Sequence, residues 1–130
     1  MTPEQKEAII QHRIQRAKET IEDARVALET NRIKNALNRI YYSAFHIVSS
    51  FAIKNEFSTS KHKQLIGWFN KYYVHTGIVS GDLYKIYSLS FNNRQESDYE
   101  DFVNFEKEEV EKHYQDMLIF VSGIEKIILK

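Results

Sequence analysis

The 130-residue sequence contains no cysteine, which excludes thiol catalysis, disulfide bonds and zinc sites built from cysteine. It has no glycine-rich loop of the kind that holds phosphate groups, and no internal repeat. Its longest apolar run, Met117–Val121, is too short to cross a bilayer. The amino terminus lacks the basic segment and apolar stretch of a secretory signal. We therefore expect a cytoplasmic protein in which residues 1–130 form one domain.

The sequence also has no excess of charge of either sign. Its 18 basic and 18 acidic residues give a formal net charge of zero, which argues against nucleic-acid binding through bulk electrostatics. The charges are nevertheless unevenly spread. Residues 94–116 carry nine acids and three bases, whereas residues 1–39 carry eight bases and six acids. A polyanionic ligand should therefore approach away from the carboxy-terminal third, attracted by local charge.

Apolar residues recur at helical spacing along most of the chain. This pattern predicts an all-α fold, a compact and mostly antiparallel bundle of about five helices. The first helix is expected to begin at Thr2 and Pro3, because Gln5 completes a capping box. Its core stripe is expected at Ile10, Ile14, Ala17, Ile21, Ala24 and Leu28. The other helices are expected over residues 31–54, over Lys61–Val74, from Ser80 onward, and after a cap at Asn104.

The segment 31–54 differs from an ordinary surface helix, because residues 35–53 contain no acidic side chain. Its apolar residues cover more than half of the helix circumference and leave a narrow polar sector. Arg39 and His46 are seven residues apart, so they lie on one face, roughly 10 Å apart along the axis. The polar sector comprises Asn35, Asn38, Arg39, Tyr42, Ser43, His46, Ser49 and Ser50.

This polar sector has two interpretations. In the first, the helix is buried on most sides, and carboxylates or carbonyls elsewhere in the bundle satisfy Arg39 and His46. In the second, the sector is an electropositive, hydroxyl-rich groove for phosphate. Arg39 would then supply a planar fork of donors, and His46 would titrate near neutral pH.

Two later residues carry a similar choice. His62 is either a second imidazole at the phosphate site or a local packing and capping group. Arg94 continues an apolar helical stripe and therefore needs a partner. That partner is either Asp98, four residues further on, or a ligand or second subunit.

Three patches of the sequence resemble the HEPN superfamily, specifically its small stand-alone bacterial and archaeal members. Asn38–His46, which reads NRIYYSAFH, resembles the R-x(4 to 6)-H signature in the form N-R-x-Y-Y-x-x-F-H. Ser60–Ile66 is similar to the S/T-x-H-K-x-L segment of these members, and Arg94–Tyr99 to their R-x-x-x-D-Y. Each patch alone is a weak match, but the three occur in the family's order.

The resemblance implies an HEPN-like bundle and, as in many members, metal-independent cleavage of single-stranded RNA by a symmetric homodimer. No metal ion or cofactor is expected. Arg39 and His46 would be catalytic, with Arg39 on the phosphate and His46 transferring protons near its unperturbed pKa of about 6.5. Because one stripe offers one well-placed imidazole, a two-fold axis past this helix would supply the second. Substrate-binding residues are expected at Asn38, Tyr42, Ser43, His62 and Arg94.

The chain departs from the family pattern at two places. Ile40 follows Arg39 where many nuclease members have a polar residue, and no tyrosine closely follows His46. Partner nucleotidyltransferases adenylylate such a tyrosine in some relatives, so its absence weakens the interpretation as the toxin of a toxin–antitoxin pair. The alternative is a non-catalytic helical module that binds nucleotide or docks a separately encoded small nucleotidyltransferase. A structural dimer without ligand is a third interpretation.

Overall fold

The structure, a computed structural model, describes residues 1–99 and 104–130. Its elements are α1 (Pro3–Glu29), α2 (Ile33–Lys54), α3 (His62–Phe69), the π-helical turn η1 (Asn70–Val74), α4 (Gly81–Tyr99) and α5 (Lys107–Ile128). Since these residues form five α-helices and no strand, the predicted all-α bundle is confirmed. No helix in this part of the chain has both the length and the apolar character needed to cross a membrane.

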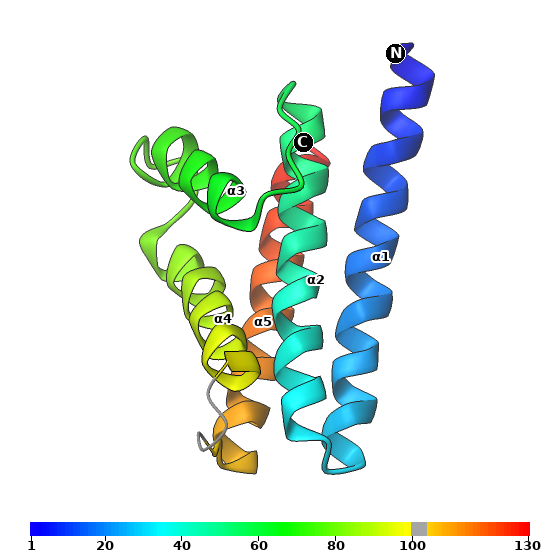
Figure 1. Cartoon of the computed structure of the whole chain (residues 1–130). Coiled ribbons are helices and arrows are strands. Elements are labelled where there is room, and N and C mark those ends of the chain that lie inside the picture. Colours follow the sequence, from blue (N-terminus) through cyan, green and yellow to red (C-terminus); the bar gives the residue numbers. More distant parts are fainter. Residues whose placement is uncertain (100–103) are drawn as a thin grey trace.

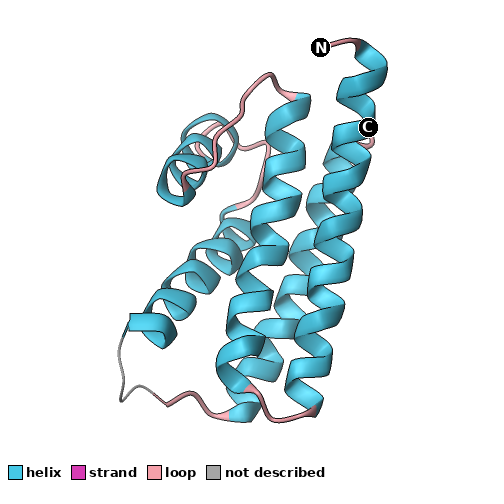
Figure 2. Ribbon diagram, turned by 45° about the vertical axis from the view of Figure 1, so that its right-hand side comes forward, coloured by secondary structure: helices cyan, strands magenta, loops and turns pink. Residues whose placement is uncertain are grey.

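Helix α2 lies at the centre of the bundle, in contact with α1, α3, α4 and α5. In Figure 1, α1 and α4 run in the opposite direction to α2 and α5, so most neighbouring helices are antiparallel. Helix α3 lies crosswise near one end of the bundle, as Figure 2 also shows. The turn between α1 and α2 is short because Asn31 adopts a positive φ of 58°, a conformation that asparagine tolerates better than most residues.

The beginnings of α1 and α4 follow the predicted capping. The Thr2 hydroxyl accepts from the Gln5 amide at 3.1 Å, and the Gln5 side chain accepts from the Thr2 amide at 2.9 Å, which completes the capping box. Ser80 Oγ accepts from the amide of Leu83 at 3.2 Å, in the first turn of α4. Both helix starts are therefore confirmed.

Two other helix ends differ from the prediction. The predicted cap at Asn104 is wrong, because Glu106 is the extended residue that precedes α5, and its side chain makes no capping hydrogen bond. Acidic residues in the first turn of α5 favour this start through the helix dipole. The helix expected over Lys61–Val74 has nearly the predicted extent, but beyond Phe69 it continues as the π-helical η1. Its apolar spacing does not distinguish these two helix types.

The packing of α1 on α2 is fixed by apolar burial and by one buried hydrogen bond. All six residues of the predicted α1 stripe are buried. Ser50 of α2 is fully buried, and its hydroxyl donates to the carbonyl of Ile10 at 2.8 Å. Because this bond joins the two helices at one position, it opposes any sliding of α1 along α2.

Phe120 on α5 provides a test of the core. It is fully buried and packs against Phe69 and Tyr87, with ring centroids 6.3 and 5.6 Å away. Phe120→Ala should lower the free energy of unfolding by about 3–5 kcal/mol in denaturant titration, because it leaves a cavity. Ile119→Ala, at a residue that is 61% exposed, should change it by less than about 0.5 kcal/mol. Equal losses in the two variants would contradict this placement of α5.

Candidate functional site

The exposed sector of α2 is formed by Asn38, Arg39, Tyr42 and His46, each of which is partly buried. Four basic or titratable side chains surround the ring of Tyr42. The guanidinium carbons of Arg39 and Arg94 lie 5.2 and 5.4 Å from the ring centroid, distances that suit cation–π contacts. The imidazole centroids of His46 and His62 lie 6.2 and 5.6 Å from the same centroid. Five of the seven predicted site residues therefore come together, from α2, α3 and α4.

The guanidinium of Arg39 is oriented by its neighbour Asn38. Its Nε and Nη2 donate to Asn38 Oδ1 at 2.9 and 2.6 Å. Arg39 also lines an open depression of about 360 Å³ between α1 and α2, which Asp23 borders from α1. Within residues 1–99 and 104–130 no carboxylate pairs with Arg39. Its charge is therefore open to an anionic ligand.

His46 is half-buried, and its pKa is lowered to about 4. Burial is the largest cause, and the positive charges of Arg16, Arg39, Arg13 and His12 add to it. The expectation of a pKa near 6.5 is therefore wrong, because helix periodicity reveals neither how deeply His46 is buried nor which cations of α1 lie opposite α2. At neutral pH the imidazole of His46 is uncharged, and it can accept a proton or a hydrogen bond.

The basic side chains of α1 are not predicted from the pattern of α2. Arg13 is partly buried, and its Nη1 donates to the carbonyl of Ser49 at 3.4 Å. Arg16 is exposed and lies one turn further along α1. A signal for both exists in the sequence, because these arginines flank the buried stripe of α1 with no acid between them. The site is thus more electropositive than α2 alone predicts.

His62 is held by a hydrogen bond from the core. Tyr41 is fully buried, and its hydroxyl lies 2.5 Å from His62 Nδ1. Burial raises the pKa of Tyr41 well above its usual value, so the phenol stays protonated. The Tyr41 hydroxyl and His62 Nδ1 share this hydrogen bond, and the tautomer of His62 sets which of the two donates. Its ring also packs against Phe45, with centroids 4.7 Å apart. His62 therefore makes a local packing contact and also lies beside Tyr42, so the structure contains both arrangements considered for it.

Arg94 likewise combines the two roles considered for it. Its Nε lies 3.0 Å from Asp98 Oδ2, so the predicted ion pair is confirmed. The Nε–H bond is not directed at that oxygen, and the contact is one of charge rather than a hydrogen bond. The guanidinium also covers the rings of Tyr41 and Tyr42, at 5.6 and 5.4 Å from their centroids. The ion pair thus holds Arg94 over the tyrosines.

Comparison with known proteins shows the family of this chain. Residues 10–127 match the HEPN domain. The protein belongs to the HEPN family. A UPF0332 protein of Thermotoga maritima is 38% identical over 95% of this chain and 94% of its own. Two Methanocaldococcus jannaschii proteins, each named "Putative toxin", are 26% and 29% identical. These matches cover 89% and 92% of this chain, and 79% and 88% of the relatives.

Ser43 of this HEPN protein does not reach the groove where a substrate contact is expected. It is fully buried, and its hydroxyl donates to the carbonyl of Ile40 at 2.7 Å. The neighbouring hydroxyls of Ser49 and Ser50 are buried as well. The reason is that α1 covers this side of α2, so the exposed sector is narrower than the polar sector of the sequence.

The HEPN site is suited to anions rather than to cations. In the described ranges no three side chains of the metal-binding types His, Asp and Glu come together, so no residue set is assigned to a metal ion. Arg39 and Arg94 provide planar donors for phosphate oxygens. The two imidazoles are kept mostly uncharged by burial, which lowers the pKa of His62 as well as that of His46. The site can therefore bind a phosphate and transfer a proton.

The pKa of His46 can be measured by NMR titration of its ring protons. We expect a midpoint near pH 4 and, in Arg16→Gln, a higher midpoint, because a nearby positive charge is removed. Lys18→Gln should leave it unchanged, since Lys18 pairs with Glu125. Between about pH 6.5 and pH 4, His46 binds more protons in the unfolded chain than in the folded chain. The free energy that His46 contributes to stability therefore falls as the pH falls. A midpoint near 6.5 would contradict the described burial of His46.

Proposed function

We propose that this HEPN protein is a metal-independent endoribonuclease that cleaves single-stranded RNA and acts in a toxin-like way. The observation that carries the proposal is the convergence of Arg39, Arg94, His46 and His62 around the ring of Tyr42. The reaction would be attack of a ribose 2′-hydroxyl on the adjacent phosphodiester. It needs a base, charge stabilisation on the phosphorane, and an acid for the departing 5′-oxygen. The names of the two M. jannaschii relatives favour the toxin-like role.

The residues of one chain would supply the first two requirements. His46, uncharged at neutral pH, would accept the proton of the 2′-hydroxyl. Arg39, oriented by Asn38, would stabilise the negative charge on the phosphorane oxygens. Arg94, whose guanidinium also lies over the ring of Tyr42, would provide a second cation for the phosphate.

A bound phosphate would also change the protonation of the site. The pKa of His46 is lowered partly by cations, so an anion among them would raise it again toward its usual value. Substrate binding would thereby allow the imidazole to hold a proton at a pH where the free protein does not. This shift makes a histidine with a pKa near 4 usable in acid–base chemistry.

The acid for the leaving oxygen would come from a second copy of the chain. A two-fold axis past the exposed sector of α2 would place His46 and Arg39 of each protomer in one cleft. One imidazole would then act as base and the other as acid. The proposed enzyme is accordingly a homodimer whose site is incomplete in one protomer.

The activity is tested with purified protein, single-stranded RNA and EDTA. We expect products with 2′,3′-cyclic phosphate ends, whereas DNA of the same sequence should survive because it lacks the attacking hydroxyl. Arg39→Ala and His46→Ala should each lower the cleavage rate by roughly 100-fold or more, since each removes a group acting in the transition state.

The matched controls for this assay are Arg25→Ala and His75→Ala. Arg25 lies on α1 in ion pairs with Glu22 and Glu29, and His75 is exposed just after η1. Both controls should retain wild-type cleavage. Cleavage that persists undiminished in Arg39→Ala and His46→Ala would trace the activity to a contaminant or another site.

The shared cleft is tested by co-expressing wild-type and His46→Ala chains. The mixed dimer keeps both Arg39 side chains but only one imidazole, so one of the two proton-transfer groups of the cleft is missing. The isolated mixed dimer should therefore cleave RNA far below half of the wild-type rate. A rate of about half the wild-type value would mean that each protomer cleaves with its own site.

The low pKa of His46 favours a second candidate function. Because the free imidazole is a weak base, the same site could hold a phosphate without breaking it. The protein would then be a non-catalytic module that binds nucleotide or docks a separately encoded small nucleotidyltransferase. Retention of intact RNA or nucleotide by the wild type, lost in Arg39→Ala, would favour this candidate over the nuclease.

A further inference from the structure

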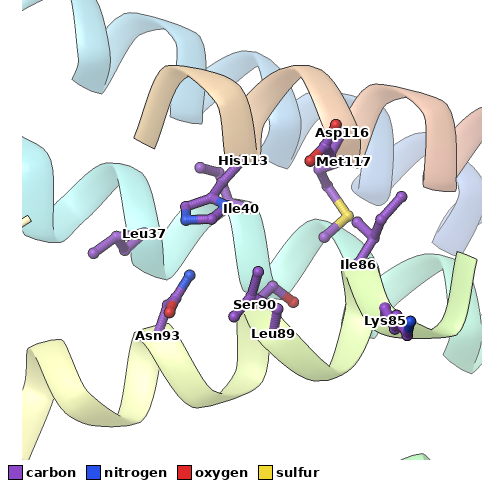
Figure 3. A pocket seen from close by; sticks show the side chains of 10 residues that line it. All are labelled: Leu37, Ile40, Lys85, Ile86, Leu89, Ser90, Asn93, His113, Asp116 and Met117. Atoms are coloured by element: carbon purple, nitrogen blue, oxygen red, sulfur yellow. The ribbon is translucent and has the colours of Figure 1, made fainter. Parts of the chain in front are cut away.

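A second pocket lies between α2, α4 and α5, and Figure 3 shows the side chains that line it. Its volume is about 130 Å³. Ile40 of α2 lies on its wall, and Tyr42, two residues further, points to roughly the opposite side of the helix. The pocket is therefore separated from the Tyr42 site by α2 itself and shares no lining residue with it.

An unpaired polar group of α4 is aimed into this pocket. Asn93 is only 7% exposed, and its Nδ2 has no hydrogen-bond partner in the described part of the chain. Figure 3 shows its amide nitrogen extending toward the imidazole of His113 on α5. Buried amide groups in folded proteins almost always meet a partner, because an unmade hydrogen bond is costly. Asn93 thus presents a donor that a pocket ligand would satisfy.

His113 supplies complementary polar atoms on the facing wall. Burial lowers its pKa, and the carboxylates of Glu109 and Asp116 oppose that shift only in part. At neutral pH its uncharged ring offers one donor and one acceptor. Asp116 itself is held by Lys112, whose Nζ lies 3.0 Å from Asp116 Oδ2. The polar part of the pocket therefore suits an uncharged ligand with both a donor and an acceptor.

The size and the other walls limit the ligand further. Ile40 and Met117 are almost fully buried and present apolar surface to the pocket. Since a cavity of about 150 Å³ can hold one benzene molecule, this pocket has room for a single six-membered ring. Lys85 and Asp116, which carry opposite charges, also line the pocket, so it gives no net advantage to a charged ring.

We propose that this pocket binds an uncharged, single-ring heterocycle with a carbonyl oxygen, of the size of a pyrimidine base. The carbonyl oxygen accepts from Asn93 Nδ2, a ring N–H donates to the acceptor nitrogen of His113, and the ring faces lie against Ile40 and Met117. This binding requires no RNA cleavage and no dimer, so it stands independently of the proposed function.

The probe is uracil, titrated into the full chain and followed by NMR. Met117 is one of two methionines, so its methyl signal is readily assigned, and the Asn93 side-chain amide gives a second signal. Both should shift saturably with uracil. Asn93→Ala should weaken uracil binding about tenfold, the value of one hydrogen bond in a buried pocket. Asn92→Ala, at the exposed neighbouring position, should not change it.

Benzene serves as the comparison ring, because it fills the same space without an acceptor oxygen. Wild-type protein should bind uracil more tightly than benzene, and this comparison decides the question even if Asn93→Ala fails to fold. Benzene binding as tight as that of uracil would overturn the proposal. An unchanged uracil affinity in Asn93→Ala would also overturn it. The absence of NMR shifts up to the solubility limit of uracil would overturn it too, and would mean that the pocket holds only water.

Discussion

Burial of α2 on most of its circumference is the constraint on which the candidate site depends. This helix packs against all four others, so hydrophobic contacts on several sides fix its rotation about its own axis. Tyr41 and Tyr42 show the consequence, since one is fully buried and its neighbour stands in the exposed sector. A rotation by one residue position would carry Arg39 and His46 about 100° away from their present place. The apolar core thus sets the geometry of the polar site.

Much of this arrangement could be predicted from the sequence, because it depends on spacing within one helix. The lack of acids in residues 35–53 and the seven-residue interval between Arg39 and His46 identify the exposed sector of α2. What could not be predicted depends on contacts between helices. The pKa of His46 reflects first its burial and then the charge of Arg16 on α1, and the burial of Ser43 reflects α1 lying over it. The π-helical form of η1 and the start of α5 also lie beyond patterns of apolar spacing.

The accumulation of cations around His46 has an electrostatic cost for the free protein. Arg13, Arg16 and Arg39 all act on one imidazole, and each lowers its pKa. Like charges held close together raise the free energy of the folded chain and create a local positive potential. That potential attracts anions even though the whole chain has no net charge. This local charge is the physical basis for the phosphate-containing ligand that we propose.

The chain order of the bundle has a consequence for when the protein can act during its own synthesis. The α1–α2 hairpin contains local contacts, which form early, and it already holds the two arginines of α1 together with Arg39 and His46. Yet the opposite face of α2 is covered by α5, which leaves the ribosome after α1–α4. Until α5 docks, nothing on that face holds α2 in one orientation. In a nascent chain, Arg39 and His46 would therefore be held imprecisely until α5 has been synthesised and has docked.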